Sequence, residues 1–155
     1  MNGWLVDTNV IVVLIAANGA ESVKRWARGV DERRLFISIL TLAEYDKGIA
    51  KLPPGDANVP RYAGARDALE ARFAGRILSL DDKIVRRWGV ISGRVKGQTG
   101  HAPPVIDTLL AATAIEANLY LASRNTRDLA SSGAAVFDPW RDDVAMFPLT
   151  PFQRG

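Results

Sequence analysis

The hydrophobic and polar positions of this chain form two kinds of pattern, which alternate from one end to the other. Short unbroken apolar runs are typical of buried strands, and they predict strands over residues 4–6, 35–39, 76–80, 120–122 and 135–137. Apolar residues at helical spacing predict helices between them, over residues 10–15, 21–30, 41–52, 62–73, from an Asp81-Asp82 cap to about 96, from Pro103-Pro104 to 117, and over 126–130. Strands that alternate with helices imply an α/β fold with a mainly parallel five-stranded sheet.

Two of the predicted helices carry an apolar stripe that is expected to face the core. The helix over residues 62–73 places Ala65, Leu69 and Phe73 on one side. The helix that follows Asp81 is expected to bury four side chains: Ile84, Val85, Trp88 and Ile91.

The length and composition are those of an ordinary globular protein, with 155 residues, 48% of them hydrophobic and 24% charged. A chain of this length suits one domain, and we predict a single domain over residues 1–155, with a core of about 1–141 and a C-terminal tail of 142–155. The longest apolar run, residues 10–17, is far shorter than the roughly 20 residues of a membrane span. No basic segment precedes it as in a signal peptide, so a cytoplasmic protein that does not contact membranes is expected.

The residue types limit the chemistry that this chain can perform. It has no Cys and a single His, His101, which excludes disulfides, cysteine zinc sites, thiol catalysis and a histidine metal cluster. The formal net charge is +3, from 20 Lys and Arg against 17 Asp and Glu, and this balance allows a polyanionic partner. Any catalysis must therefore rest mainly on carboxylates, hydroxyls, amides, Lys and Arg.

Four acidic residues follow the predicted strands closely, at element ends that a parallel sheet gathers at one edge: Asp7, Glu44, Asp107 and Asp128. In parallel sheets the functional site lies outside the carboxyl ends of the strands. Carboxylates held close together repel one another, and Mg²⁺ or Mn²⁺ removes that repulsion because both ions prefer oxygen ligands. Such ions support phosphodiester hydrolysis by activating a water and stabilising the leaving oxygen.

Each of these acids also has an ordinary structural explanation. Asp7 can cap the helix that starts near Asn9, and Asp128 can belong to a simple loop-to-helix start. Glu44 and Asp107 can be first-turn acids favoured by the helix dipole. The pattern alone leaves both interpretations open.

Four motifs in order along the chain resemble those of PIN-domain nucleases. They cover residues 5–10 (LVDTNV), residues 40–44 (LTLAE) followed by Gly48-Ile49, residues 107–114 (DTLLAATA), and residues 123–129 (SRNTRDL) followed by 137–140 (FDPW). The resemblance spans almost the whole chain. The compact size and these variants of the motifs look most like VapC-type toxins of type II toxin–antitoxin modules.

The resemblance implies a three-layer α/β/α sandwich and an endoribonuclease that uses one or two Mg²⁺ or Mn²⁺ ions. It assigns metal binding and catalysis to Asp7, Glu44 and Asp107, with Glu44 as a further ligand or as the residue that orients the attacking water. Some family members carry Asp where this chain has Asn125. Asp128, three residues on, is therefore our candidate for the fourth acid.

Four further residues have expected roles around this site. Thr8 is expected to support the carboxylates through its hydroxyl, and Asn125 to hold a metal-bound water through its amide. Arg124 and Arg127 flank the fourth position, and we expect them to contact RNA phosphates.

Resemblance to the toxins also implies partners: RNA as substrate, a second copy in a homodimer, and a small cognate antitoxin in a hetero-oligomer. Two alternatives from other functional classes are a nuclease acting on DNA or flaps, and a non-catalytic PIN-like module that binds RNA or protein. A phosphatase with Asp7 as nucleophile is disfavoured because Asn9 stands where such enzymes need a second Asp.

Overall fold

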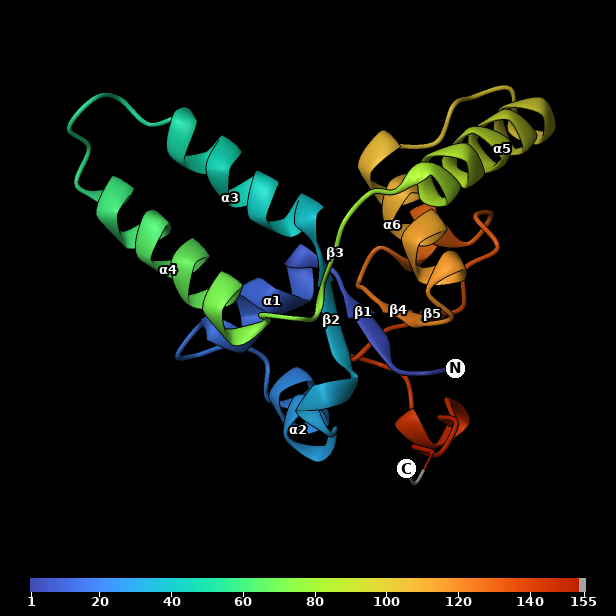
Figure 1. The fold of residues 1–155 in the computed structure, drawn as a ribbon, viewed down its shortest axis with the longest axis horizontal. Coiled ribbons are helices and arrows are strands. Elements are labelled where there is room, and N and C mark those ends of the chain that lie inside the picture. The colour runs from blue at the N-terminus through green and yellow to red at the C-terminus, as the bar shows by residue number, and fades with distance from the viewer. Residues whose placement is uncertain (154–155) are drawn as a thin grey trace.

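The computed structural model describes residues 1–153, and its central feature is a five-stranded sheet with the order β3-β2-β1-β4-β5 (Figure 1). The strands are β1 (Trp4–Val6), β2 (Leu35–Ser38), β3 (Ile77–Leu78), β4 (Tyr120–Ala122) and β5 (Val136–Phe137). Every neighbouring pair is parallel, so the predicted α/β class and five-stranded sheet are confirmed. The third strand is shorter than the apolar run that predicted it.

Seven α-helices of the described residues connect and flank these strands: α1 (Thr8–Ile15), α2 (Glu21–Gly29), α3 (Ile39–Ala50), α4 (Asn58–Arg72), α5 (Asp82–Thr99), α6 (Val105–Glu116) and α7 (Thr126–Leu129). Two short 3₁₀ turns, Glu32–Arg34 and Val144–Met146, were not predicted. Asp81 caps α5 as expected, since its carboxylate accepts from Ile84 N at 2.9 Å. In α3 the cap is Ser38, whose Oγ accepts from Leu40 N at 3.1 Å. This helix therefore begins at Ile39, two residues earlier than predicted.

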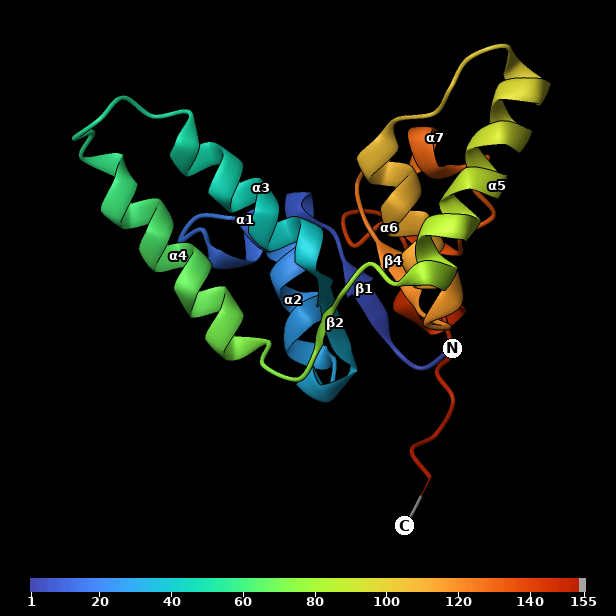
Figure 2. The same cartoon turned by 45° about the horizontal axis from the view of Figure 1, so that its top comes forward.

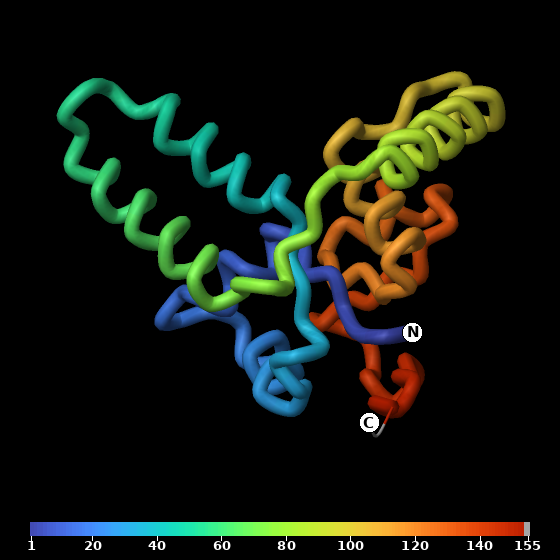
Figure 3. The backbone as a smooth tube through the Cα atoms, in the orientation of Figure 1, coloured from blue at the N-terminus to red at the C-terminus, as the bar shows by residue number. Residues whose placement is uncertain are grey.

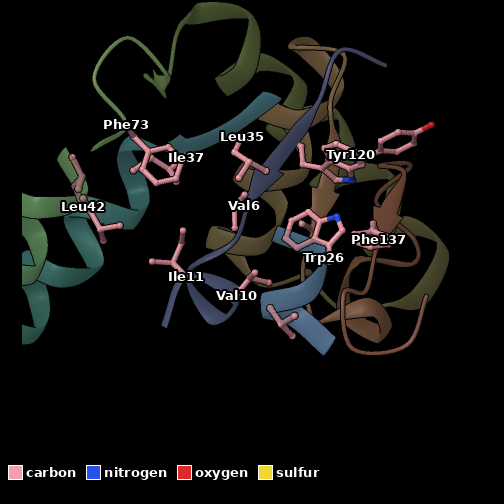
Figure 4. Packing of buried hydrophobic residues seen from close by; sticks show 14 residues of the cluster. Val6, Val10, Ile11, Trp26, Leu35, Ile37, Leu42, Phe73, Tyr120 and Phe137 are labelled. Carbon is pink, nitrogen blue, oxygen red and sulfur yellow. The ribbon is translucent and has the colours of Figure 1, made fainter. Parts of the chain in front are cut away.

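The side chains of each strand point alternately to two faces of the sheet, and each face has its own apolar cluster. On one face Trp4 and Val6 pack with residues of α1, α2 and α4, as Figure 4 shows for the labelled part of this cluster. On the other face Leu5 packs with residues of α6 and α7. Helices on both faces of one sheet make the three-layer sandwich that the resemblance implied.

Helix α5 forms an outer layer that packs on α6 rather than on the sheet. Its buried residues Ile84, Ile91 and Val95 contact Ala112 of α6. The prediction that Val85 is buried is wrong, because its side chain is 43% exposed. At about 100° per residue, Val85 points well away from the narrow stripe that a single neighbouring helix can cover. In α4 the predicted stripe is confirmed: Leu69 and Phe73 are buried, and Ala65 is half-buried.

The chain leaves β1 and β2 at the same edge of the sheet, where α1 and α3 begin (Figure 1, Figure 3). The α3–α4 pair lies on one side of this edge and the α5–α6 pair on the other, in both orientations (Figure 1, Figure 2). The first turns of α3 and α6 therefore face the space beyond the carboxyl ends of β1 and β4. No helix of the described residues is long and apolar enough to cross a membrane.

The C-terminal segment runs back past the opposite edge of the sheet, beside the N-terminus (Figure 1). Thr150 N donates to Met1 O at 2.8 Å, and the buried Arg34 donates to Thr150 O at 2.6 Å. Phe147 of the same segment packs against Tyr120 and Phe137. A division into a core of 1–141 and a tail of 142–155 stays a prediction, and the last two residues of that tail lie outside the described residues.

Candidate functional site

Asp7 follows β1 directly and is buried at the carboxyl edge of the sheet, with 5% of its surface exposed. Its backbone N–H donates to Ala122 O at 2.9 Å, which extends the β1–β4 pairing by one residue. Its carboxylate accepts from Thr8 N at 2.7 Å and so also caps α1. The capping alternative considered for this residue is therefore present in the structure. Capping uses one oxygen only, and the second oxygen has other partners.

Ser123 supplies the strongest of these other contacts, with its Oγ 2.7 Å from Asp7 Oδ2. The Val6–Ala122 register of β1 and β4 places the two residues side by side. The Ser123 hydroxyl donates to Asp7 and accepts from Asn9 Nδ2 at 3.2 Å and from Asn125 N at 3.0 Å. All of the hydroxyl's hydrogen-bonding capacity is used, so Ser123 holds the Asp7 carboxylate in one orientation.

Glu44 lies in the second turn of α3, half-buried. Because α3 begins at Ile39, Glu44 is not a first-turn acid, and the helix-dipole explanation does not apply to it. The Thr8 hydroxyl interacts with the Glu44 carboxylate and lies 3.0 Å from the Thr41 hydroxyl. A Thr8 hydroxyl that donates to Glu44 can accept from Thr41, so the pair positions the carboxylate.

Asp107 occupies the first turn of α6 and is half-buried. It comes from the opposite side of the sheet edge to Glu44, so Asp7 lies between them in the fold. The side-chain amide of Asn125 lies near the Asp107 carboxylate and acts to lower its pKa. The backbone N–H of Asn125 donates to Ser123 Oγ, so Asn125 adjoins both residues.

The pKa values of all three carboxylic acids are raised above their ordinary values. Burial is the largest cause for each. For Asp7 the charge of Asp107 adds to it, and for Glu44 the charges of Asp7 and Asp107 do so. The three carboxylates thus repel one another in a partly desolvated site. A bound cation would reverse this effect.

A cavity of about 580 Å³ brings these carboxylates to one surface, and we call it the carboxylate cavity. Its lining residues are Asp7, Thr8, Asn9, Val12, Glu44, Lys47, Gly48, Lys51, Ile106, Asp107 and Asn125. Its donor set of carboxylate, hydroxyl and amide groups fits Mg²⁺ or Mn²⁺ by ligand type. Among the described residues, no three acidic or His side chains are arranged so that they could hold an ion as they stand.

The remaining predicted site residues lie outside this cavity. Asp128 is exposed. Its negative charge is the second-largest cause, after burial, of the raised pKa of Asp107. Arg124 is exposed, and its guanidinium stacks 4.9 Å from the centre of the Trp140 ring. Arg127 is exposed on α7. The structure thus brings Thr8 and Asn125 together with the three carboxylates, and leaves Asp128 and the two arginines at the periphery.

Four polar residues of the site were missed by the sequence reasoning. Asn9 donates to Asp7 Oδ2 at 3.3 Å and lines the carboxylate cavity. Ser123 was part of a motif without a role, although it directly follows a predicted strand, as Asp7 does. Lys47 and Lys51 line the carboxylate cavity from α3. Their positions three and seven residues after Glu44 place them on the same helix face, which is a signal that sequence spacing does contain.

We expect the substitution Ser123→Ala to lower Mg²⁺ affinity or cleavage activity about 10- to 100-fold, because a carboxylate that has lost its orienting hydrogen bond binds metal less well. The matched control is Ser132→Ala, which removes another buried hydroxyl that donates to Leu129 O at 2.6 Å, away from the carboxylates. The measurement is the Mg²⁺ concentration that gives half-maximal cleavage. Equal Mg²⁺ dependence in the two variants would contradict a positioning role for Ser123.

Comparison with known proteins identifies relatives over most of the chain. The sequence model of the PIN domain matches residues 4–131. Toxin FitB of Neisseria gonorrhoeae is 30% identical over 138 residues, covering 89% of this chain and 99% of that protein. VapC ribonuclease Y4jK of Sinorhizobium fredii is 27% identical over 136 residues, covering 88% of this chain and 96% of that protein.

Solved structures show the same arrangement of elements. The structure of FitAB bound to an IR36 DNA fragment superposes with a TM-score of 0.79 at 28% identity, covering 90% of this chain and 97% of that one. VapBC-1 from nontypeable Haemophilus influenzae superposes with a TM-score of 0.74 at 23% identity, covering 89% and 98%. The second comparison supports the fold alone.

Proposed function

Because the chain belongs to the PIN-domain family, we propose that it is a metal-dependent endoribonuclease and the toxin of a toxin–antitoxin pair. One observation carries the catalytic part of this proposal. Asp7, Glu44 and Asp107 come from α1's cap, α3 and α6, and line a single cavity at the carboxyl edge of the sheet. A structural role for each acid separately gives no reason for three such groups to share one partly desolvated space.

When bound, one or two Mg²⁺ or Mn²⁺ ions would activate water and stabilise the charge that develops at phosphate. Asp7 and Asp107 would hold the ion, with Asp7 oriented by Ser123 and Asp107 oriented by Asn125. Glu44 serves as a further ligand or orients the attacking water. In the second role its carboxylate accepts a proton from that water as the water attacks.

For the fourth position we favour Asn125 over Asp128. Both residues are exposed, but Asn125 lines the carboxylate cavity and Asp128 does not. In this arrangement Asp128 adds negative charge near Asp107 without direct contact with an ion. Arg124 and Arg127, exposed on the same segment, would contact phosphates further along the RNA.

The proposed partners follow from Toxin FitB and from the structure described as FitAB, to which this chain is similar. By this analogy the chain binds a small antitoxin, in the cytoplasm where its RNA substrates are. The proposed homodimer rests on the resemblance to VapC-type toxins. Some apolar side chains are exposed, for example Val90 at 67% and Val105 at 56%, and partner chains often cover such side chains. A short reading frame next to the one that encodes this protein, with a product that inhibits the cleavage, would support the proposed antitoxin.

We expect the purified protein to cleave single-stranded RNA in Mg²⁺ or Mn²⁺ and to lose all cleavage in EDTA. Without a cation, the negatively charged carboxylates cannot neutralise the negative charge of the phosphate. Gel analysis of labelled RNA and duplex DNA, with and without EDTA and with readdition of Mn²⁺, measures this. Cleavage that persists in EDTA would contradict the metal-dependent reading. Cleavage of duplex DNA or flaps instead of RNA would favour the DNA nuclease, and RNA binding without cleavage would favour a non-catalytic module.

A further inference from the structure

Gly48 lies in the last turn of α3 (Ile39–Ala50), and nothing inside the protein requires a glycine there. A Cβ built on it would meet nothing within 4 Å. The residue has ordinary helical backbone rather than the left-handed conformation that favours glycine. Glycine within a helix is destabilising relative to alanine, because the unfolded chain loses more conformational freedom on folding when the residue is glycine. The same holds for other helical glycines of α4 and α5, so the place of Gly48 beside the site is what distinguishes it: Gly64, Gly89, Gly93 and Gly97.

Gly48 also lies where two cavities meet. One is the carboxylate cavity. The other, of about 800 Å³, is formed between α1, α3 and α4, and we call it the adjoining cavity. Both are lined by Glu44, Gly48 and Lys51. The space that an alanine methyl group would fill is thus on the path from one cavity to the other, where a ligand can approach the helix backbone closely.

The charges beside Gly48 indicate what kind of ligand this is. Lys47 and Lys51 line the carboxylate cavity on the same face of α3. The adjoining cavity adds Arg61, whose guanidinium lies 5.3 Å from the centre of the Tyr62 ring, and the half-buried Tyr45. Cations that alternate with aromatic rings suit a nucleic acid strand, because phosphates bind the cations and bases stack on the rings.

We propose, on the basis of the ribonuclease function above, that the RNA backbone crosses α3 at Gly48 between these two cavities. The scissile phosphate lies at the carboxylates, and Lys47 and Lys51 contact the phosphates next to it. The adjoining nucleotide enters the second cavity, with its base against Tyr62 and Arg61. A side chain at position 48 would hold the RNA backbone away from the helix.

The test compares Gly48→Ala with Gly93→Ala, a matched change in α5 that likewise brings no Cβ contact within 4 Å. Both variants should melt about 2 °C higher than the parent protein, since alanine is the better helix former. Only Gly48→Ala should weaken RNA binding, by roughly 10-fold, the effect of losing about one good hydrogen-bonded contact. A purely structural role for Gly48 would lower the melting temperature.

Binding is measured in Mg²⁺ by fluorescence anisotropy of a labelled single-stranded RNA of 12 nucleotides that contains all four bases. Each substitution is made in an Asp107→Asn background, which is expected not to cleave this RNA. Lys47→Gln and Lys51→Gln should each reduce the slope of log affinity against log salt by about 0.7, the value for one phosphate contact on a single strand. Arg86→Gln, on the exposed face of α5, is the control and should leave the slope unchanged.

Two outcomes would overturn this inference. They are unchanged RNA affinity in Gly48→Ala and unchanged salt slopes in the lysine variants. If Gly48→Ala keeps its RNA affinity and instead escapes inhibition by the antitoxin, the path between the cavities binds a protein. In each of these cases metal-dependent cleavage by the parent protein still stands, so failure here is distinct from failure of the ribonuclease assignment.

Discussion

Asp107→Asn is expected to lower RNA cleavage by at least about 10²- to 10³-fold, the effect of removing one charge-stabilising group from an active site. In the proposed mechanism Asp107 holds the ion together with Asp7, and an amide is a much weaker ligand for Mg²⁺ than a carboxylate. Cleavage is measured under single-turnover conditions at saturating Mg²⁺. Undiminished cleavage by this variant would remove Asp107 from the site.

The same substitution should raise the melting temperature of the metal-free protein. The pKa of Asp107 is raised by burial and by the charge of Asp128, so the folded protein binds a proton here more readily than the unfolded chain. Ionised Asp107 therefore costs stability at neutral pH, and this cost disappears as the pH falls through the raised pKa. An asparagine has no charge to desolvate, so the variant should be more stable at pH 7 and lose this part of the pH dependence.

Asp82→Asn is the matched control for this prediction. Asp82 is also a first-turn acid, at the start of α5, where it is exposed. Removing a charge that the helix dipole favours should lower stability slightly. Scanning calorimetry with and without Mg²⁺ measures both variants. Mg²⁺ should stabilise the parent protein and Asp82→Asn by ligand linkage, and should not stabilise Asp107→Asn. Equal responses to Mg²⁺ would contradict the proposed metal site.

Phe137→Ala is expected to lower the free energy of unfolding by about 3–5 kcal/mol, the range for deleting a buried aromatic ring. Phe137 is 1% exposed. Its ring centre lies 5.2 Å from that of Trp26 (Figure 4), 6.3 Å from that of Trp4 and 4.9 Å from that of Phe147. An alanine therefore leaves a cavity between three aromatic groups. A domain typically has only about 5–15 kcal/mol in total, so this variant should be close to the limit of folding.

Urea unfolding of the metal-free protein measures this effect, with the midpoint lowered and the denaturant slope unchanged. Met146→Ala is the control, because Met146 belongs to the same C-terminal segment and is 76% exposed. It should change stability by less than about 0.5 kcal/mol. A loss below 1 kcal/mol in Phe137→Ala would mean that the C-terminal segment does not hold Phe147 against the core.

Local patterns predicted most of the fold because buried strands and amphipathic helices differ in periodicity. One error lies at a local cap. Ile39 continues an apolar run and was expected in a strand, but the Ser38 cap starts α3 at Ile39, two residues earlier than predicted. The other error depends on a longer-range contact. Val85 is apolar and close to the stripe of α5, but only α6 covers that helix. A single sequence does not show how many neighbours a helix has.

The residues of the candidate site also fall into two groups, those that local patterns predict and those that depend on longer-range contacts. Asp7 and Asp107 could be predicted because each directly follows a strand or opens a helix at the functional edge. The contact of Ser123 with Asp7 depends on the register between β1 and β4, which are separated by more than a hundred residues along the chain. The preference for Asn125 over Asp128 depends on how the loop after β4 turns. Neither feature has a local signal.

The hydrogen bond between Thr150 and Met1 has a practical consequence for protein engineering. The two ends of the described fold meet at the sheet edge opposite the carboxylates, so a short linker from residue 150 to residue 1 should allow circular permutation. New termini could then be opened at the exposed Pro53-Pro54-Gly55 turn between α3 and α4. A reporter domain fused there would stand beside the proposed RNA path, whereas one fused at the native N-terminus would stand on the far side of the sheet.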